Sequence, residues 1–154
     1  MVVKNSKKKI GDYRQDKKIE VTGELVEIIN KSMSGSYRRK LRGHPAKKVF
    51  QALRIEVNDE LENLEKAMSS GIDYLKPGSR MVIISYHSLE DRIVKKNFEL
   101  FAGKCICPGD LPECRCGAKK RGRLITRKPI RPSQEEISKN PRAKSAKMRV
   151  FEKQ

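Results

Sequence analysis

Apolar residues between residues 44 and 70 recur at spacings of three and four, which is typical of a helix that buries one face. This stripe consists of Phe50, Leu53, Val57, Leu61, Leu64 and Met68. His44-Pro45 precedes it, and proline suits a first helical position because its missing N–H would have no partner there. We predict one helix that starts at this dipeptide and ends near Gly71, before a turn at Pro77-Gly78.

The apolar run from Met81 to Ser85 is continuous and bounded by turn-forming residues, so it predicts a strand buried on both faces. Ser88 follows it, with Asp91 three positions later. This spacing predicts a helix that Ser88 caps and that ends near Phe101. A helix, a turn, a buried strand and a second helix in this order indicate an α/β unit of a parallel sheet.

Shorter elements flank this unit. Residues 1–18 are polar and are expected to lack regular structure, Thr22 is expected to cap a short helix, and residues 32–42 form a basic connector. Further along, residues 124–126 are predicted to form a strand, and Ser133 to cap a short helix that ends at Asn140-Pro141. Alternation over residues 147–151 predicts a last strand.

Positive charge is concentrated in two arms of the chain, whose formal net charge is +17. Residues 1–50 carry 14 Lys+Arg against 5 Asp+Glu, and residues 117–154 carry 13 against 3, whereas residues 51–102 carry 7 against 9. Basic arms release condensed counterions when they bind phosphates, so nucleic acid is the first partner to consider. The alternative is a pair of solvated tails.

Membrane insertion and export have no support in the sequence. No apolar stretch approaches the roughly 20 residues of a membrane span, and the basic residues 1–9 are not followed by the apolar segment of a signal peptide. We therefore expect no membrane partner and a cytoplasmic location. In that compartment the four cysteines would stay reduced or bind metal.

The polar segment that follows the predicted buried strand is a candidate site. Ligands of open α/β sheets bind beyond the carboxyl ends of the strands, so His87, Glu90, Asp91 and Arg92 are candidates for a catalytic substrate pocket. A structural role is the alternative, in which Ser88 and Asp91 cap the helix and Arg92 pairs with a neighbouring carboxylate.

The four cysteines form two close pairs, Cys105 with Cys107 and Cys114 with Cys116, separated by a stretch rich in proline and glycine. Four thiolates folded back in this way would suit one tetrahedral zinc ion. The usual knuckle has two residues between its cysteines, whereas each pair here has one. Four reduced thiols on a mobile hairpin are the alternative.

Cations along the C-terminal arm would be able to follow an RNA backbone. Those that we expect to contact RNA are Arg127, Lys128, Arg142, Lys144, Lys147 and Arg149. Phe151 is the only aromatic residue in this arm, so the arm is expected to position RNA rather than to read its bases.

Five stretches of the chain resemble one protein family. They are His44-Pro-Ala-Lys-Lys-Val-Phe-Gln-Ala-Leu-Arg-Ile-Glu-Val-Asn-Asp-Glu-Leu61, Leu75-Lys-Pro-Gly78, Ile84-Ser-Tyr-His-Ser-Leu-Glu-Asp-Arg-Ile-Val-Lys95, Thr126-Arg-Lys-Pro-Ile130 and Asn140-Pro-Arg-Ala-Lys-Ser-Ala-Lys-Met-Arg149. The family is that of the bacterial S-adenosylmethionine-dependent methyltransferases that modify cytosine N4 in 16S rRNA. The resemblance covers about residues 10–154, with Tyr86 where the family more often has phenylalanine.

The resemblance implies an α/β fold, a partial Rossmann-like methyltransferase sheet with the end of a helical insertion and a closing antiparallel strand pair. Residues 1–43 would be a basic tail and the end of that insertion. Residues 44–154 would be the C-terminal part of the methyltransferase domain, with a cysteine-containing hairpin at residues 103–118.

The family's glycine-rich loop, its acidic ribose-binding residue and its Asp-Leu-Gly loop are absent from this sequence. No donor-binding residue is therefore carried over, and we expect the chain to be inactive without the missing N-terminal half. The implied partner is 16S rRNA or the small ribosomal subunit. A non-enzymatic, basic, ribosome-associated RNA-binding protein with a zinc hairpin is the alternative function.

Overall fold

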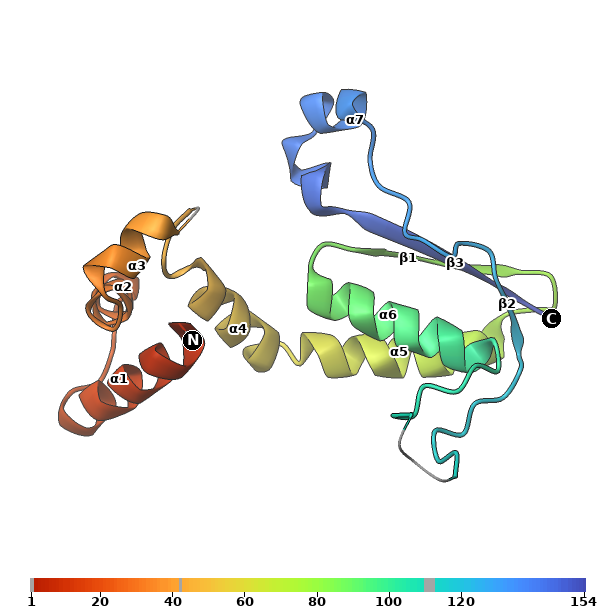
Figure 1. Ribbon diagram of the computed structural model, residues 1–154, viewed down its shortest axis with the longest axis horizontal. Helices are drawn as coiled ribbons and strands as arrows, with labels where there is room; N and C mark the ends of the chain where they lie inside the picture. Colours follow the sequence, from red (N-terminus) through yellow and green to blue (C-terminus); the bar gives the residue numbers. More distant parts are fainter. Residues whose placement is uncertain (1, 42, 110–112) are drawn as a thin grey trace. The chain divides into compact units, whose positions relative to one another are not determined.

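The structure is a computed structural model that describes residues 2–41, 43–109 and 113–154 (Figure 1). The chain divides into two compact units, Met1–Glu60 and Leu61–Gln154. The boundary that the sequence suggested at residue 43 falls inside the first unit, because Ala46 and Val49 pack on the buried side chain of Ile29. None of the helices described is long and apolar enough to cross a membrane.

The first unit contains four helices: α1 (Val2–Asp16), α2 (Thr22–Lys31), α3 (Gly35–Lys40) and α4 (Lys47–Val57). Its core consists of Ile29, Ala46 and Val49, with Ile10 of α1 packed against them. The prediction that residues 1–18 lack regular structure is therefore wrong, because α1 supplies part of this core. The predicted connector over residues 32–42 also contains a short helix, α3, which the Ser34 hydroxyl caps by accepting the N–H of Tyr37.

The long helix predicted from residue 44 onward is divided in two. Helix α4 ends at Val57 and α5 spans Glu60–Tyr74. Between them Asp59 adopts a left-handed backbone conformation with φ of 49°, which short polar side chains tolerate better than others. Gly71 does not end the helix as predicted, because α5 continues to Tyr74 and Ile72 belongs to its buried face.

The second unit is built on a three-stranded sheet with the order β1-β3-β2. Its strands are β1 (Arg80–Ser85), β2 (Gly122–Leu124) and β3 (Lys147–Lys153), and both pairings are antiparallel. The predicted closing pair of antiparallel strands is confirmed by β2 and β3, although β2 starts and ends two residues before the predicted strand over residues 124–126. The whole unit confirms the predicted α/β class. Between β2 and β3 lie α7 (Gln134–Lys139), capped by Ser133 as predicted, and the 3-10 helix η1 (Pro141–Ser145).

One face of this sheet is covered by α5 and α6 (Ser88–Phe101), which run side by side (Figure 1). The centre of the core is Phe151 of β3, which is fully buried. Its ring lies 5.4 Å from that of Phe98 and 5.9 Å from that of Phe101, measured between centroids. Helix α6 ends at Phe101, as the sequence predicted.

The prediction that β1 is buried on both faces is wrong for this structure. Met81 and Ile83 pack on the core, but Val82 and Ile84 are 52% and 53% exposed. Among the described strands β1 pairs only with β3, and no parallel pair occurs. A second covering layer and a neighbouring parallel strand would be needed to produce the burial that the apolar run predicts.

Candidate functional site

His87 lies directly after β1 and caps α6. Its Nδ1 accepts the N–H of Glu90 at 3.3 Å, while the Glu90 carboxylate accepts the N–H groups of Tyr86 at 2.8 Å and His87 at 3.1 Å. The predicted capping box is thus present but shifted by one residue. Ser88 is the first helical residue rather than the cap, and Glu90 rather than Asp91 closes the box. The extended backbone of His87 brings its imidazole over the first turn, which spacing alone does not reveal.

The same pair also brings an imidazole nitrogen close to a carboxylate. Nε2 of His87 lies 3.1 Å from Oε1 of Glu90, and the two side chains are 11% and 22% exposed. Because Nδ1 accepts a backbone N–H, a neutral His87 carries its proton on Nε2, beside Glu90. This arrangement places an imidazole nitrogen beside a carboxylate at the carboxyl end of β1.

Asp91, another candidate of this segment, joins α6 to β3. Its carboxylate accepts hydrogen bonds from Nε of Arg149 at 2.7 Å and from Nζ of Lys147 at 3.1 Å. Burial opposes ionisation of Asp91, but these two cations outweigh it and hold the pKa of the carboxyl below its ordinary value of 3.8. Arg92, the fourth candidate of the segment, is exposed.

The predicted RNA-contacting residues fall into two groups. Arg127, Lys128, Arg142 and Lys144 are exposed, the first two after β2 and the last two in η1. Lys147 and Arg149 instead pair with Asp91, and Arg149 is only 8% exposed. The exposed group is therefore the one whose charge is available to phosphates.

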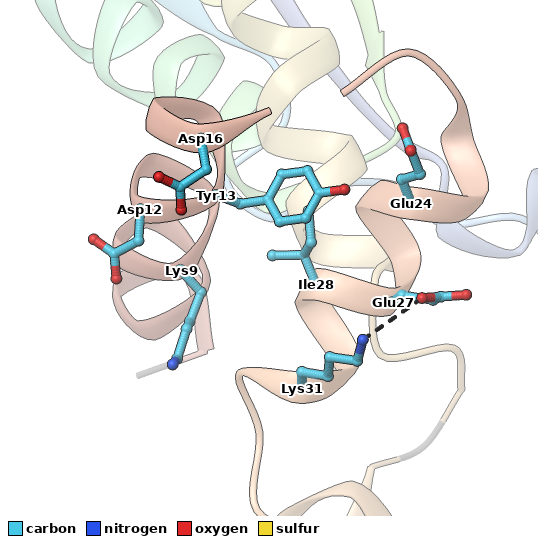
Figure 2. A pocket seen from close by; sticks show the side chains of 8 residues that line it. All are labelled: Lys9, Asp12, Tyr13, Asp16, Glu24, Glu27, Ile28 and Lys31. Carbon is cyan, nitrogen blue, oxygen red and sulfur yellow. Dashed lines mark ion pairs between the residues drawn. The ribbon is translucent and has the colours of Figure 1, made fainter. Parts of the chain in front are cut away.

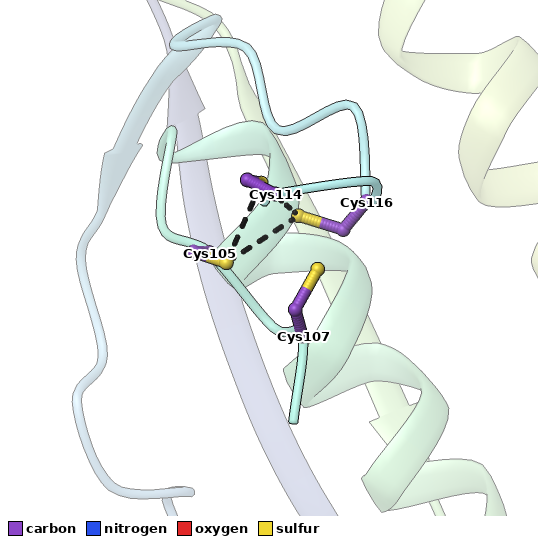
Figure 3. Close-up of side chains that lie close together, drawn as sticks. All are labelled: Cys105, Cys107, Cys114 and Cys116. Carbon is purple, nitrogen blue, oxygen red and sulfur yellow. Dashed lines mark hydrogen bonds between the residues drawn. The ribbon is translucent and has the colours of Figure 1, made fainter. Parts of the chain in front are cut away.

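The four cysteine sulfurs converge in the hairpin that projects from the end of α6 (Figure 3). Sγ of Cys114 lies 3.5 Å from that of Cys105 and 3.4 Å from that of Cys116, and all four sulfurs lie within 4.8 Å of one another. The cysteines are free rather than joined in disulfides. Residues 110–112 of the predicted hairpin, which include Pro112, lie outside the described residues.

Hydrogen bonding distributes negative charge unevenly within this cysteine cluster. The backbone of Ile106, the thiol of Cys114 and the backbone of Ala118 favour the thiolate of Cys116 and lower its pKa to about 6. For Cys114 the backbone of Cys116 favours the thiolate, but hydrogen bonds with the thiols of Cys116 and Cys105 outweigh it and raise the pKa to about 12. Hydrogen bonding therefore favours the thiolate of Cys116 over that of Cys114.

A groove of about 620 Å³ adjoins the base of this hairpin. Its cationic lining comes from Lys119, Lys120 and Arg121, and Phe101 and Asn97 also line it. Arg121 forms an ion pair with Asp73, another lining residue. The predicted basic arm included these three cations, but no local pattern indicates that they line a groove.

A pocket of about 320 Å³ in the first unit was missed by sequence reasoning, because residues 1–18 were not expected to form a helix (Figure 2). Helices α1 and α2 line it with four carboxylates and two lysines around an apolar contact: Lys9, Asp12, Tyr13, Asp16, Glu24, Glu27, Ile28 and Lys31. Hydrogen bonds from Lys17 and from the backbone of Glu20 and Val21 lower the pKa of Glu24 to about 2. The excess of carboxylates makes this pocket unfavourable for phosphate.

Comparison with known proteins gives consistent matches. Residues 2–154 match the MraW methylase family. "Ribosomal RNA small subunit methyltransferase H" of Acetivibrio thermocellus is 54% identical over 144 residues, which cover 94% of this chain and 46% of the relative. The protein of the same name from Halothermothrix orenii is 51% identical over 140 residues, which cover 91% of this chain and 45% of the relative.

A third relative, "Ribosomal RNA small subunit methyltransferase H 2" of Agathobacter rectalis, is 51% identical over 150 residues, or 97% of this chain and 48% of the relative. The chain spans about half the length of the curated relatives it matches. A family match over nearly every residue confirms the resemblance that the sequence motifs indicated. The chain belongs to the MraW methylase family.

Proposed function

We propose that this chain forms the C-terminal half of an S-adenosylmethionine-dependent methyltransferase that modifies N4 of a cytidine in 16S rRNA of the small ribosomal subunit. The observation that carries the proposal is the family match over residues 2–154, together with relatives of 51–54% identity that are named as small-subunit rRNA methyltransferases. The free thiols fit a reducing compartment, so we place the protein in the cytoplasm.

S-adenosylmethionine would supply the methyl group from its sulfonium. In the candidate segment the two carboxylates already hold the start of α6 and its contact with β3: Oε2 of Glu90 accepts two backbone N–H groups, and Asp91 accepts Lys147 and Arg149. The donor-binding motifs of the family are also absent from this sequence. We therefore assign the donor site to the part of the relatives that this chain does not match.

The residues of this chain would act on the cytidine rather than on the methyl donor. Its N4 is a poor nucleophile because the nitrogen lone pair is delocalised into the ring, so the amine has to be held in line with the methyl group and has to lose a proton. His87 with Glu90 and the exposed Arg92 are our candidates for that pocket, and Asp91 supports it through β3. The flanking phosphates would be held by the exposed cations Arg127, Lys128, Arg142 and Lys144. Lys147 and Arg149, which pair with Asp91, would add to the positive charge of this RNA-binding arm.

The uncovered sheet face supports a requirement for the rest of the domain. Val82, Ile84 and Ile130 are each about half exposed, and one edge of β1 has no partner strand among the described residues. Exposed apolar surface beside an open strand edge marks an interface. A further strand and covering helices from the unmatched half of the relatives would bury these side chains.

A reconstitution assay tests the proposal. We expect the chain alone to transfer no labelled methyl group from S-adenosylmethionine to small ribosomal subunits. Together with the part of the Halothermothrix orenii relative that it does not match, it should do so. Replacing Val82 and Ile84 with aspartate should abolish the reconstituted activity, whereas the matched change Val57→Asp, also at an exposed site, should not. RNA binding without methyl transfer in the mixture would favour the non-enzymatic alternative.

A further inference from the structure

We propose that Cys105, Cys107, Cys114 and Cys116 bind one structural zinc ion. A zinc–sulfur distance of about 2.3 Å in a tetrahedron places neighbouring sulfurs about 3.8 Å apart. The three separations among Cys105, Cys114 and Cys116 are 3.4, 3.5 and 3.9 Å. The fourth sulfur, of Cys107, lies within 4.8 Å of the others, so a single ion reaches all four.

Neither a disulfide nor packing as a small apolar residue accounts for this cluster of cysteines. A disulfide would bring two sulfurs to about 2.05 Å, much closer than the separations among Cys105, Cys114 and Cys116, and all four cysteines are free. Cysteines that pack as small apolar residues are usually among the most buried side chains, yet Cys105 and Cys114 are exposed. Four thiols that point at one another on a surface, rather than into a core, are arranged for a ligand at their centre (Figure 3).

Backbone contacts and a tight turn in the described part of the hairpin also support a metal ion at the centre of the four sulfurs. The N–H of Arg115 points at Sγ of Cys107 at 3.4 Å, a contact that stabilises a thiolate ligand. Gly117 turns the chain directly after Cys116 with φ of 64°, a conformation that favours glycine. The stem is closed by the bridge between Ala102 and Lys120 and by the N–H of Arg121, which donates to the carbonyl of Phe101 at 2.7 Å.

Charge in the neighbourhood also fits a tetrathiolate zinc centre, whose net charge is −2. The hairpin and its stem carry four cations, Lys104, Arg115, Lys119 and Lys120, against two acidic residues, Asp110 and Glu113, so the sequence here has a positive excess that offsets this charge. With four protein ligands the ion has no open position, so its role is to shape the hairpin rather than to activate water. It would hold Lys119–Arg121 along the groove that they line.

Native mass spectrometry of the full chain, expressed with zinc supplied, tests this inference. We expect one zinc ion per chain, at least about a tenfold loss of zinc affinity in Cys107→Ser and in Cys116→Ser, and unchanged zinc content in Glu113→Gln. This last variant changes a polar side chain of the same hairpin without removing a sulfur. A metal-free native chain, or full zinc retention in both cysteine variants, would overturn the proposal.

Two further readouts separate metal loss from misfolding. Cobalt(II) bound in place of zinc should give the intense absorption of a tetrahedral thiolate site, and a chelator should make all four thiols reactive to alkylation. Circular dichroism of the cysteine variants should stay unchanged, because the hairpin lies outside the core around Phe98 and Phe151. Thiols that react fully before chelation, or that are joined in disulfides, would count against a zinc site.

Discussion

The imidazole of His87 occupies the position at which a helix usually has serine, threonine or aspartate. Together with the Glu90 carboxylate it satisfies three backbone donors, those of Tyr86, His87 and Glu90, which would otherwise lack partners at the start of α6. A residue that looks catalytic from its place after a strand is therefore also part of the scaffold. Any loss of activity on its substitution has to be separated from loss of stability.

We predict that His87→Ala lowers the free energy of unfolding by about 0.5–2 kcal/mol, because the N-cap acceptor is lost. Ser88→Ala should change it by less than about 0.5 kcal/mol, since Ser88 is helical and exposed. His87→Asn should restore most of the stability by providing another acceptor. Denaturant unfolding measures all three, and a larger loss in Ser88→Ala than in His87→Ala would contradict the assigned cap.

The carboxylate of Asp91 should make stability depend on pH. Its pKa in the folded chain is lowered, so its contribution is complete well above pH 3.8 and is lost as the pH falls through the folded pKa. We predict that Asp91→Asn costs about 1.5–3 kcal/mol at neutral pH, because it removes a charged hydrogen-bond partner of Arg149 and Lys147. In this variant the loss of stability in acid should be smaller than in the natural chain.

Glu62→Gln is the matched control for Asp91→Asn, because it neutralises a carboxylate in an exposed helical pair with Lys66. It should leave stability and its acid dependence almost unchanged. Unfolding curves at several pH values compare the two variants. Equal effects of the two substitutions would show that Asp91 does not join α6 to β3 in the way described.

At the scale of elements, β2 lies against β3 with no spare volume at Gly122. A methyl group there would overlap the carbonyl oxygen of Glu152 and lie 2.6 Å from the ring of Phe151. Gly71 in α5 is different, since its nearest neighbour would be the Met81 methyl at 3.4 Å, an ordinary contact. Gly122 therefore leaves no room for a side chain, whereas Gly71 leaves room for a methyl group.

We predict that Gly122→Ala destabilises the chain by about 1–3 kcal/mol or more, because backbone and core have to move apart. Gly71→Ala should instead stabilise it by about 0.4–1 kcal/mol, because alanine suits the interior of a helix and restricts the unfolded chain. Thermal unfolding of both variants checks this pair. A destabilised Gly71→Ala would indicate that α5 ends there after all.

Local signals predicted several elements correctly. The cap at Ser133, the end of α6 at Phe101 and the strand from Lys147 were all correct because neighbouring residues determine them. The helix α1 was missed because its few apolar residues, Ile10 among them, become a pattern only against a core from elsewhere in the chain. The break at Asp59 was missed because the apolar spacing continues across it.

The contacts of the candidate site could be predicted only in part. The polar segment follows a strand and begins a helix, as the sequence indicated, but the contact between Asp91 and Arg149 spans 58 positions and follows no local rule. Spacing did predict which cysteines would meet, since two close pairs on a hairpin have few other arrangements.

At the scale of the whole molecule, the net charge of +17 should dominate the interaction with RNA. We predict RNA binding that weakens steeply between about 50 and 200 mM salt, with little sequence preference. Replacing Arg142 and Lys144 with alanine should reduce the salt slope by about two units, one for each phosphate contact. Lys66→Ala should leave the slope unchanged, because that ammonium pairs with Glu62. Affinity that does not respond to salt would contradict phosphate contacts.

The identity of the methylated nucleoside tests the central claim most directly. Small ribosomal subunits from cells that lack the endogenous enzyme would be incubated with S-adenosylmethionine and the reconstituted full-length protein, and the RNA digested and analysed by mass spectrometry. The account predicts one new N4-methylated cytidine in 16S rRNA, absent when this chain is omitted. A methyl group on cytosine C5, on another base or on no nucleoside would contradict it.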